Sequence, residues 1–148
     1  MLGQPHAGGM QSPDAQRNLQ KLMVWWIIWG AILSGLVMLY LFLGRGQPIP
    51  KELSQENMLT GLIGLIPLFI SVVIRWLVLP RCTVMNRAFV LFIVGLSLAE
   101  ACGILGIFFG GLYRDDLFVI GLFGIVQYVP IFAKNYVEPK GTGFIPNN

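Results

Sequence analysis

Four long apolar runs constrain the fold more than any other feature of this sequence. They cover residues 22–44, 59–79, 88–111 and 117–133. A hydrocarbon core of about 30 Å requires roughly 20 apolar residues in a helix. Lipid offers no partner to backbone N–H and C=O groups, and no run shows the alternating pattern of a membrane barrel strand. The sequence therefore predicts an all-α polytopic membrane protein with four transmembrane helices.

The rest of the chain leaves little room for chemistry outside a membrane. Charged residues make up only 11% of the 148 residues, against about 25% in soluble proteins. A polar segment (1–21) precedes the four-helix domain (22–133), and an irregular tail (134–148) follows it. His6 is the only histidine, and no Ser-His-Asp set or phosphate loop is present. We expect neither an enzyme nor a metal or cofactor site, and the net charge of +3 without a basic block predicts no nucleic-acid partner.

Charge placement predicts the orientation of the helices. Four spans place both termini on one side, together with most of the basic residues: Arg17, Lys21, Arg75, Arg81, Arg87, Lys134 and Lys140. The other side carries Arg45, Lys51 and Arg114. The positive-inside rule then predicts cytoplasmic termini, and we expect a bacterial cytoplasmic membrane. Aromatic residues near the predicted boundaries indicate interfacial belts: Trp25, Trp26, Trp29, Trp76, Tyr128 and Tyr136 on the cytoplasmic side, and Tyr40 and Tyr113 on the other.

Glu100 is the only acidic residue inside any of the four runs. If residues 88–111 form one helix, Glu100 lies about 16 to 18 Å from either end, near the centre of a bilayer. An isolated carboxylate is costly there, so we expect it to be protonated, paired or hydrated. Glu100 is therefore the first candidate for a functional site.

Ser34, Ser71 and Gln127 are predicted to lie at a similar depth to Glu100, one on each of the other spans. Either Gln127 or a serine could then hydrogen-bond to Glu100 across the bundle and form a proton- or ion-binding layer. The alternative is that the serines bond to their own backbone and that Gln127 forms an interhelical packing bond. We expect that alternative for both serines.

Proline, glycine and arginine add three further expectations. Pro130 is predicted to free the carbonyl of Val126, and Pro67 that of Ile63. Arg75 lies about five residues from Pro80, so we expect its side chain to reach the cytoplasmic headgroups. Small residues on the third span predict close helix packing there: Gly95, Gly103, Gly106 and Gly110.

The stretch FIVGLSLAEACGILGIFFGG resembles the second helix of the c subunit (proteolipid) of rotary ATP synthases. The match consists of Glu100-Ala101 followed by Gly103-Ile104, with Pro80 and Arg81 in the preceding loop, and covers residues 75–111. This resemblance implies that Glu100 is a proton- or sodium-binding carboxylate. The chain departs from the family pattern because its second span contains Pro67 and lacks a dense glycine repeat, and because it has four spans.

Two functions follow from these features. The favoured one is a small structural or accessory subunit whose apolar helices pack against other membrane proteins or against copies of itself within the lipid bilayer. The alternative is proton or cation conduction through Glu100, in the manner of a c subunit. Small size and the absence of catalytic motifs favour the first.

Overall fold

The structure is a computed structural model that describes residues 13–45 and 58–137. The four predicted runs coincide with four helical segments long and apolar enough to cross a membrane, Leu19–Gly44, Leu62–Arg81, Met85–Phe109 and Gly111–Ala133, which confirms the all-α fold. Each segment is built on one α-helix. These α-helices are α1 (Pro13–Leu39), α2 (Met58–Val73), α3 (Met85–Phe109) and α4 (Arg114–Val126), and a short α5 (Lys134–Val137) follows. Wider π-helical turns extend α1 over Tyr40–Gly44 and α2 over Ile74–Val78.

The observed bounds differ from the predicted ones at polar ends and in the fourth span, where the α-helix stops at Val126 instead of continuing to residue 133. Helix α1 begins nine residues before the predicted span, because the polar segment preceding the apolar run is already helical. Helix α4 begins at Arg114, three residues early, and α5 places a helical turn in the tail that was predicted to be irregular. His6, Lys51, Lys140 and the rest of segments 1–12, 46–57 and 138–148 lie outside the described residues.

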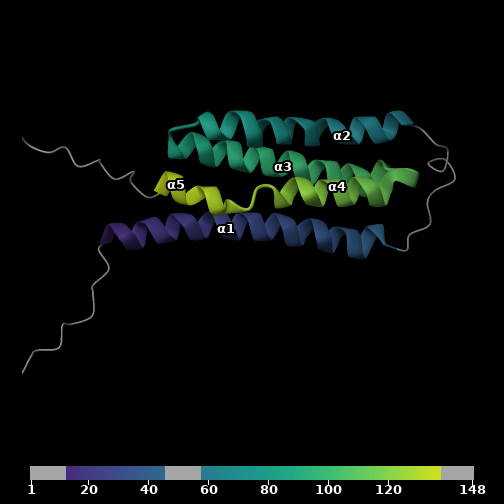
Figure 1. Cartoon of the computed structure of the whole chain (residues 1–148). Coiled ribbons are helices and arrows are strands. Elements are labelled where there is room, and N and C mark those ends of the chain that lie inside the picture. The colour runs from purple at the N-terminus through teal and green to yellow at the C-terminus, as the bar shows by residue number, and fades with distance from the viewer. Residues whose placement is uncertain (1–12, 46–57, 138–148) are drawn as a thin grey trace, which may run out of the picture.

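Helices α3 and α4 form the centre of the bundle, with α2 on one side and α1 on the other (Figure 1). The two central helices are antiparallel because only a short turn, with 3₁₀ geometry over Gly111–Tyr113, joins them. Gly111 has a φ of 52°, a left-handed conformation that glycine adopts without a steric penalty. The described chain begins and ends at the same end of the bundle (Figure 1).

Close contact between α3 and α4 depends on small residues. A Cβ atom on Gly121 would lie 2.7 Å from the backbone nitrogen of Gly103, so the two helix backbones almost touch. The four predicted packing glycines of α3 all lie at crowded positions: Gly95 faces the Tyr128 ring, Gly103 faces Leu36, Gly106 faces Leu117, and Gly110 adjoins the backbone of Arg114. Small residues thus let three elements approach α3 closely.

Aromatic residues form part of the core at the end where α1 begins. The Trp25 ring is 1% exposed and lies 4.7 Å from the Phe92 ring centroid and 5.1 Å from that of Phe89. Tyr128 is fully buried as well. The prediction of an interfacial belt is therefore wrong for these two residues, because packing between helices takes up their rings, while Trp26 and Trp76 remain exposed.

We predict that Gly121→Ala destabilises the protein by about 1 to 3 kcal/mol, because the new methyl group meets backbone atoms that cannot move aside. Gly35→Ala is the matched control, since a Cβ there meets nothing within 4 Å. That control should leave stability unchanged or raise it by up to about 1 kcal/mol through helix propensity. Unfolding by sodium dodecyl sulfate in mixed micelles measures both, and equal effects would contradict the close contact.

Candidate functional site

Helix α4 breaks inside the fourth membrane-spanning segment. The segment covers Gly111–Ala133, but the α-helix ends at Val126 and a 3₁₀-helix resumes at Pro130. Between them, Val129 has extended backbone angles (φ −46°, ψ 123°), consistent with a residue that precedes proline. Backbone groups at such a break need partners, because lipid supplies none.

Side chains from both outer helices bind the broken segment. From α1, Trp29 Nε1 donates to the carbonyl of Ile125 at 3.0 Å. From the α2 side, Arg75 Nε donates to the carbonyl of Gln127 at 2.8 Å. Trp76 Nε1 also donates to the side-chain carbonyl Oε1 of Gln127 at 3.1 Å. The break is thus held from two sides.

Near Pro130, the side chain of Arg75 binds the backbone carbonyl of Gln127, and not that of Val126, which was predicted to be free. The carbonyl of Val126 accepts a hydrogen bond from the backbone N–H of Val129 at 3.0 Å, so the prediction that Pro130 frees it is wrong. A tight turn satisfies that group locally. Within the described chain, the carbonyl of Gln127, one residue further on, is bonded by Arg75 instead.

Arg75 does not simply reach toward the headgroups, as predicted from its distance to Pro80. Its guanidinium carbon lies 4.3 Å from the centroid of the Phe132 ring and 6.0 Å from that of Tyr128. The side chain is half-buried and turns toward the break. The reason is that the break after α4 exposes the carbonyl of Gln127 as an acceptor and turns the rings of Tyr128 and Phe132 toward the guanidinium group.

Ser71 and Tyr128 connect the break to α2 and α3. The Tyr128 hydroxyl donates to the backbone carbonyl of Ser71 at 2.6 Å, and Ser71 Oγ donates to the carbonyl of Gly95 at 2.7 Å. Both side chains are fully buried. Ser71 was expected to bond to its own helix, and that expectation is wrong because α3 packs close enough for the carbonyl of Gly95 to accept the bond from Ser71 Oγ.

Together these residues form what we call the break cluster: Trp29, Ser71, Arg75, Trp76, Gln127 and Tyr128. It contains two of the four polar residues predicted from depth, Ser71 and Gln127. Ser34 lies outside it on the exposed face of α1 and donates to the carbonyl of Ala31 at 3.0 Å, as expected for a serine that bonds to its own helix. Sequence reasoning assigned Tyr128 and Trp29 to a belt and so missed their roles in the cluster.

Glu100 also lies outside the break cluster. It is half-buried, and within the described part of the chain it forms no hydrogen bond or ion pair. It lies one turn before Gly103, the glycine that Leu36 of α1 packs against, and therefore on the side of α3 that faces α1. From the ends of α3 at Met85 and Phe109, its depth is about 22 Å and about 14 Å. The four residues of the predicted polar layer thus lie in three separate places: the break cluster, the exposed face of α1 and the side of α3 that faces α1.

Comparison of the chain with protein-family models, with curated proteins and with solved structures gave no match. The four apolar helices make it an integral membrane protein. Across the described residues, no three His, Cys, Asp or Glu side chains group together as metal ligands, and Cys82 and Cys102 are free thiols. Function must therefore be inferred from Glu100, the break cluster and the surfaces of the bundle.

We predict that Trp29→Phe destabilises the protein by about 1 kcal/mol more than Trp26→Phe, because the phenyl ring keeps part of the aromatic packing but removes the N–H that binds the Ile125 carbonyl. Trp26→Phe is the control, since Trp26 is exposed and its ring contacts Trp29 without taking part in the break. Denaturation in mixed micelles should separate the two variants. A loss no larger for Trp29 than for Trp26 would contradict the role given to Trp29.

Proposed function

We propose that this protein is a structural or accessory subunit of a larger membrane assembly, in which a helix of a partner covers the seam between α1 and α3 at Glu100. One observation carries the proposal. The Glu100 carboxyl group lies deep in a membrane-spanning helix, is open on one side, and has no partner among the described residues.

The energy of an unpaired carboxyl group supports a partner outside the bundle. A polar group that meets only hydrocarbon loses several kcal/mol, and even a neutral carboxyl has one donor and one acceptor to satisfy. Three other polar side chains of the spans are satisfied within the bundle: Ser34 by its own helix, and Ser71 and Tyr128 by each other and by Gly95. Among the described residues, Nε2 of Gln127 also has no partner, but it is buried inside the break cluster, whereas Glu100 is placed where another helix can reach it.

The surface of α1 beside this seam supports close approach by another helix. Leu36 packs on Gly103, so Gly35 lies at nearly the same level as Glu100. Gly35 and Ala31 are exposed on this side of α1, whereas Ser34 lies on the face opposite Leu36, and a Cβ on Gly35 would meet nothing within 4 Å. Small residues on an open face allow helix backbones to approach closely in lipid. This surface suits a partner helix that presents a hydrogen-bond donor to Glu100. That helix belongs either to another protein or to a second copy of this chain.

Conduction of a proton or cation through Glu100 is the competing function. It gains less support, because the described residues form no hydrogen-bonded connection between Glu100 and the break cluster. Proton or sodium flux into vesicles that contain the purified protein distinguishes the two functions. Flux that is lost in Glu100→Gln would favour conduction and count against the accessory role.

Photo-crosslinking in native membranes tests the proposed contact. A benzophenone amino acid at Ser97, which is exposed one turn before Glu100 on α3, should give a discrete protein adduct. That adduct should fall at least fivefold in Glu100→Leu, since leucine offers neither a donor nor an acceptor. The mass of the adduct tells a second copy from another protein.

The matched control is the same probe at Phe69 of α2, which is 71% exposed, on a helix that is not part of the seam. Its adducts, whether with lipid or with protein, should not change in Glu100→Leu. Lipid adducts alone from Ser97, or a protein adduct that persists in Glu100→Leu, would contradict the proposal.

A further inference from the structure

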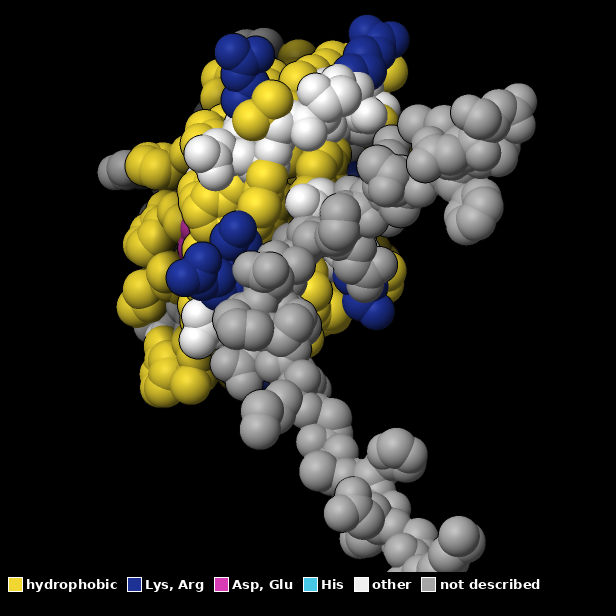
Figure 2. Space-filling model, turned by 90° about the vertical axis from the view of Figure 1, so that its left-hand side faces the viewer, with side chains coloured by type: hydrophobic (Ala, Val, Ile, Leu, Met, Phe, Trp, Pro, Cys, Tyr) yellow, Lys and Arg dark blue, Asp and Glu magenta, His cyan; other side chains and the backbone are white. Residues whose placement is uncertain are grey.

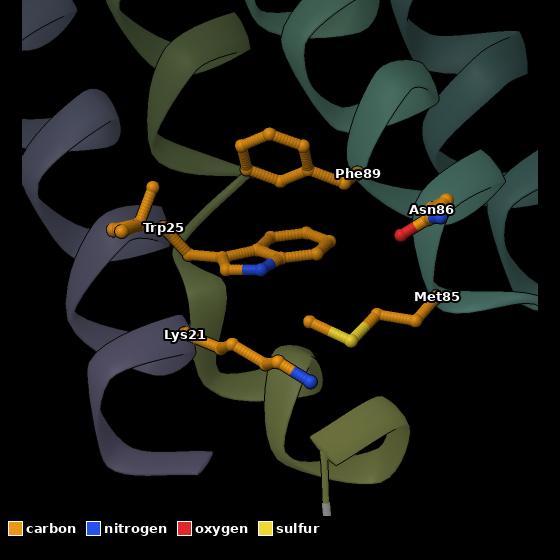
Figure 3. A pocket seen from close by; sticks show the side chains of 6 residues that line it. Lys21, Trp25, Met85, Asn86 and Phe89 are labelled. Atoms are coloured by element: carbon orange, nitrogen blue, oxygen red, sulfur yellow. The ribbon is translucent and has the colours of Figure 1, made fainter. Parts of the chain in front are cut away.

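A cleft opens between the beginning of α1 and the beginning of α3. It has a volume of about 150 Å³ and is lined by six residues: Lys21, Val24, Trp25, Met85, Asn86 and Phe89. Figure 3 shows the Trp25 ring between Phe89 on one side and the side chains of Lys21 and Met85 on the other. The walls are therefore apolar and aromatic, with one ammonium group and one amide at the edge.

The cleft lies at the level where lipid headgroups meet acyl chains. Lys21 comes just after the start of the first membrane-spanning segment, Leu19–Gly44, and Met85 is the first residue of the third. Trp25 and Phe89 form the apolar inner wall of the cleft, while Lys21 and Asn86 are exposed at its edge. A ligand that fits must be apolar at one end and polar at the other.

Charge around the cleft selects an anionic polar end. Arg17 lies one turn before Lys21 on α1, and Arg87 follows Asn86 on α3. Among the side chains that the structure describes, none that lines the cleft is acidic. Lysine and arginine side chains gather at this end of the molecule (Figure 2). Each basic residue near a membrane surface attracts anionic lipid.

The first turn of α3 adds donors at the same place. Its N-cap residue, Val84, provides no side-chain hydrogen bond, and the first backbone bond of the helix runs from Ala88 N–H to Val84 at 3.0 Å. The N–H groups of the residues before Ala88, which include Met85 and Asn86, therefore have no partner within the helix. The N-terminal end of a helix also carries a partial positive charge that attracts phosphate.

From the cleft, its level and its charge, we propose that an anionic phospholipid binds here. Its phosphate lies beside Lys21 and the N-terminus of α3, and the upper part of one acyl chain packs against Val24 and Phe89. A dry apolar cavity of about 150 Å³ holds a group the size of benzene, so the cleft accommodates several methylene groups of the chain.

Native mass spectrometry of the detergent-solubilised full chain tests the site, with phosphatidylglycerol and phosphatidylcholine as probes. The wild type should retain phosphatidylglycerol more tightly than phosphatidylcholine. Lys21→Gln should weaken retention of phosphatidylglycerol about fivefold, the effect expected for one basic residue at a membrane surface. Lys134→Gln is the control, because Lys134 is an exposed cation at the same end that does not line the cleft.

Val24→Phe tests whether lipid retention depends on the open cleft and not on charge alone, since the larger side chain fills the cleft without altering any charge. It should also weaken phosphatidylglycerol retention, while thermal unfolding in detergent confirms that the variant folds. Equal losses in Lys21→Gln and Lys134→Gln, unchanged retention in folded Val24→Phe, or equal retention of both lipids by the wild type would overturn the proposal.

Discussion

The need to satisfy backbone groups at the break in α4 determines how this small bundle is assembled. A membrane helix normally satisfies its own N–H and C=O groups, but Pro130 interrupts that pattern inside the fourth span. Trp29 of α1 and Arg75 of the α2 extension bind carbonyl groups around the break. Two outer helices that pack on opposite sides of the α3–α4 hairpin are thereby fixed to it by specific hydrogen bonds as well as by packing.

The same requirement explains why the polar residues of the spans have separate roles. Ser71, Tyr128 and Gln127 serve the break, where donors and acceptors from neighbouring helices meet. Glu100 is about one and a half turns away from the nearest of these contacts along α3, at Gly95, and faces α1. Its side chain has no partner among the described residues and, unlike the buried Nε2 of Gln127, it can be reached from outside the bundle, which is why an accessory role is favoured over a conducting one.

Much of the fold follows from the sequence, because apolar length alone determines four helices and a short turn determines that α3 and α4 are neighbours. The site was less predictable. Depth can be counted along a helix, but the direction in which a side chain points depends on how helices rotate about their axes when they pack. Ser71 and Glu100 were placed at one depth, yet they belong to different surfaces.

Two residues show where counting along the chain fails. Arg75 was expected at the headgroups because only its own helix was considered, whereas its acceptor lies 52 positions later in a segment that is not helical. Trp25 was expected at the interface because of its residue type, whereas three phenylalanine rings from α3 and the 3₁₀-helix enclose it. In both cases the decisive partner comes from a contact between elements far apart in sequence.

The hydrogen bond between Arg75 Nε and the carbonyl of Gln127 is the most direct test of the central claim. Solid-state nuclear magnetic resonance of the protein in lipid bilayers measures the dipolar coupling between ¹⁵Nε of Arg75 and the carbonyl ¹³C of Gln127. A hydrogen bond of 2.8 Å between nitrogen and oxygen predicts a nitrogen–carbon separation of less than about 4 Å. Strong dephasing at that distance would support the account, and its absence from a folded, labelled sample would contradict it.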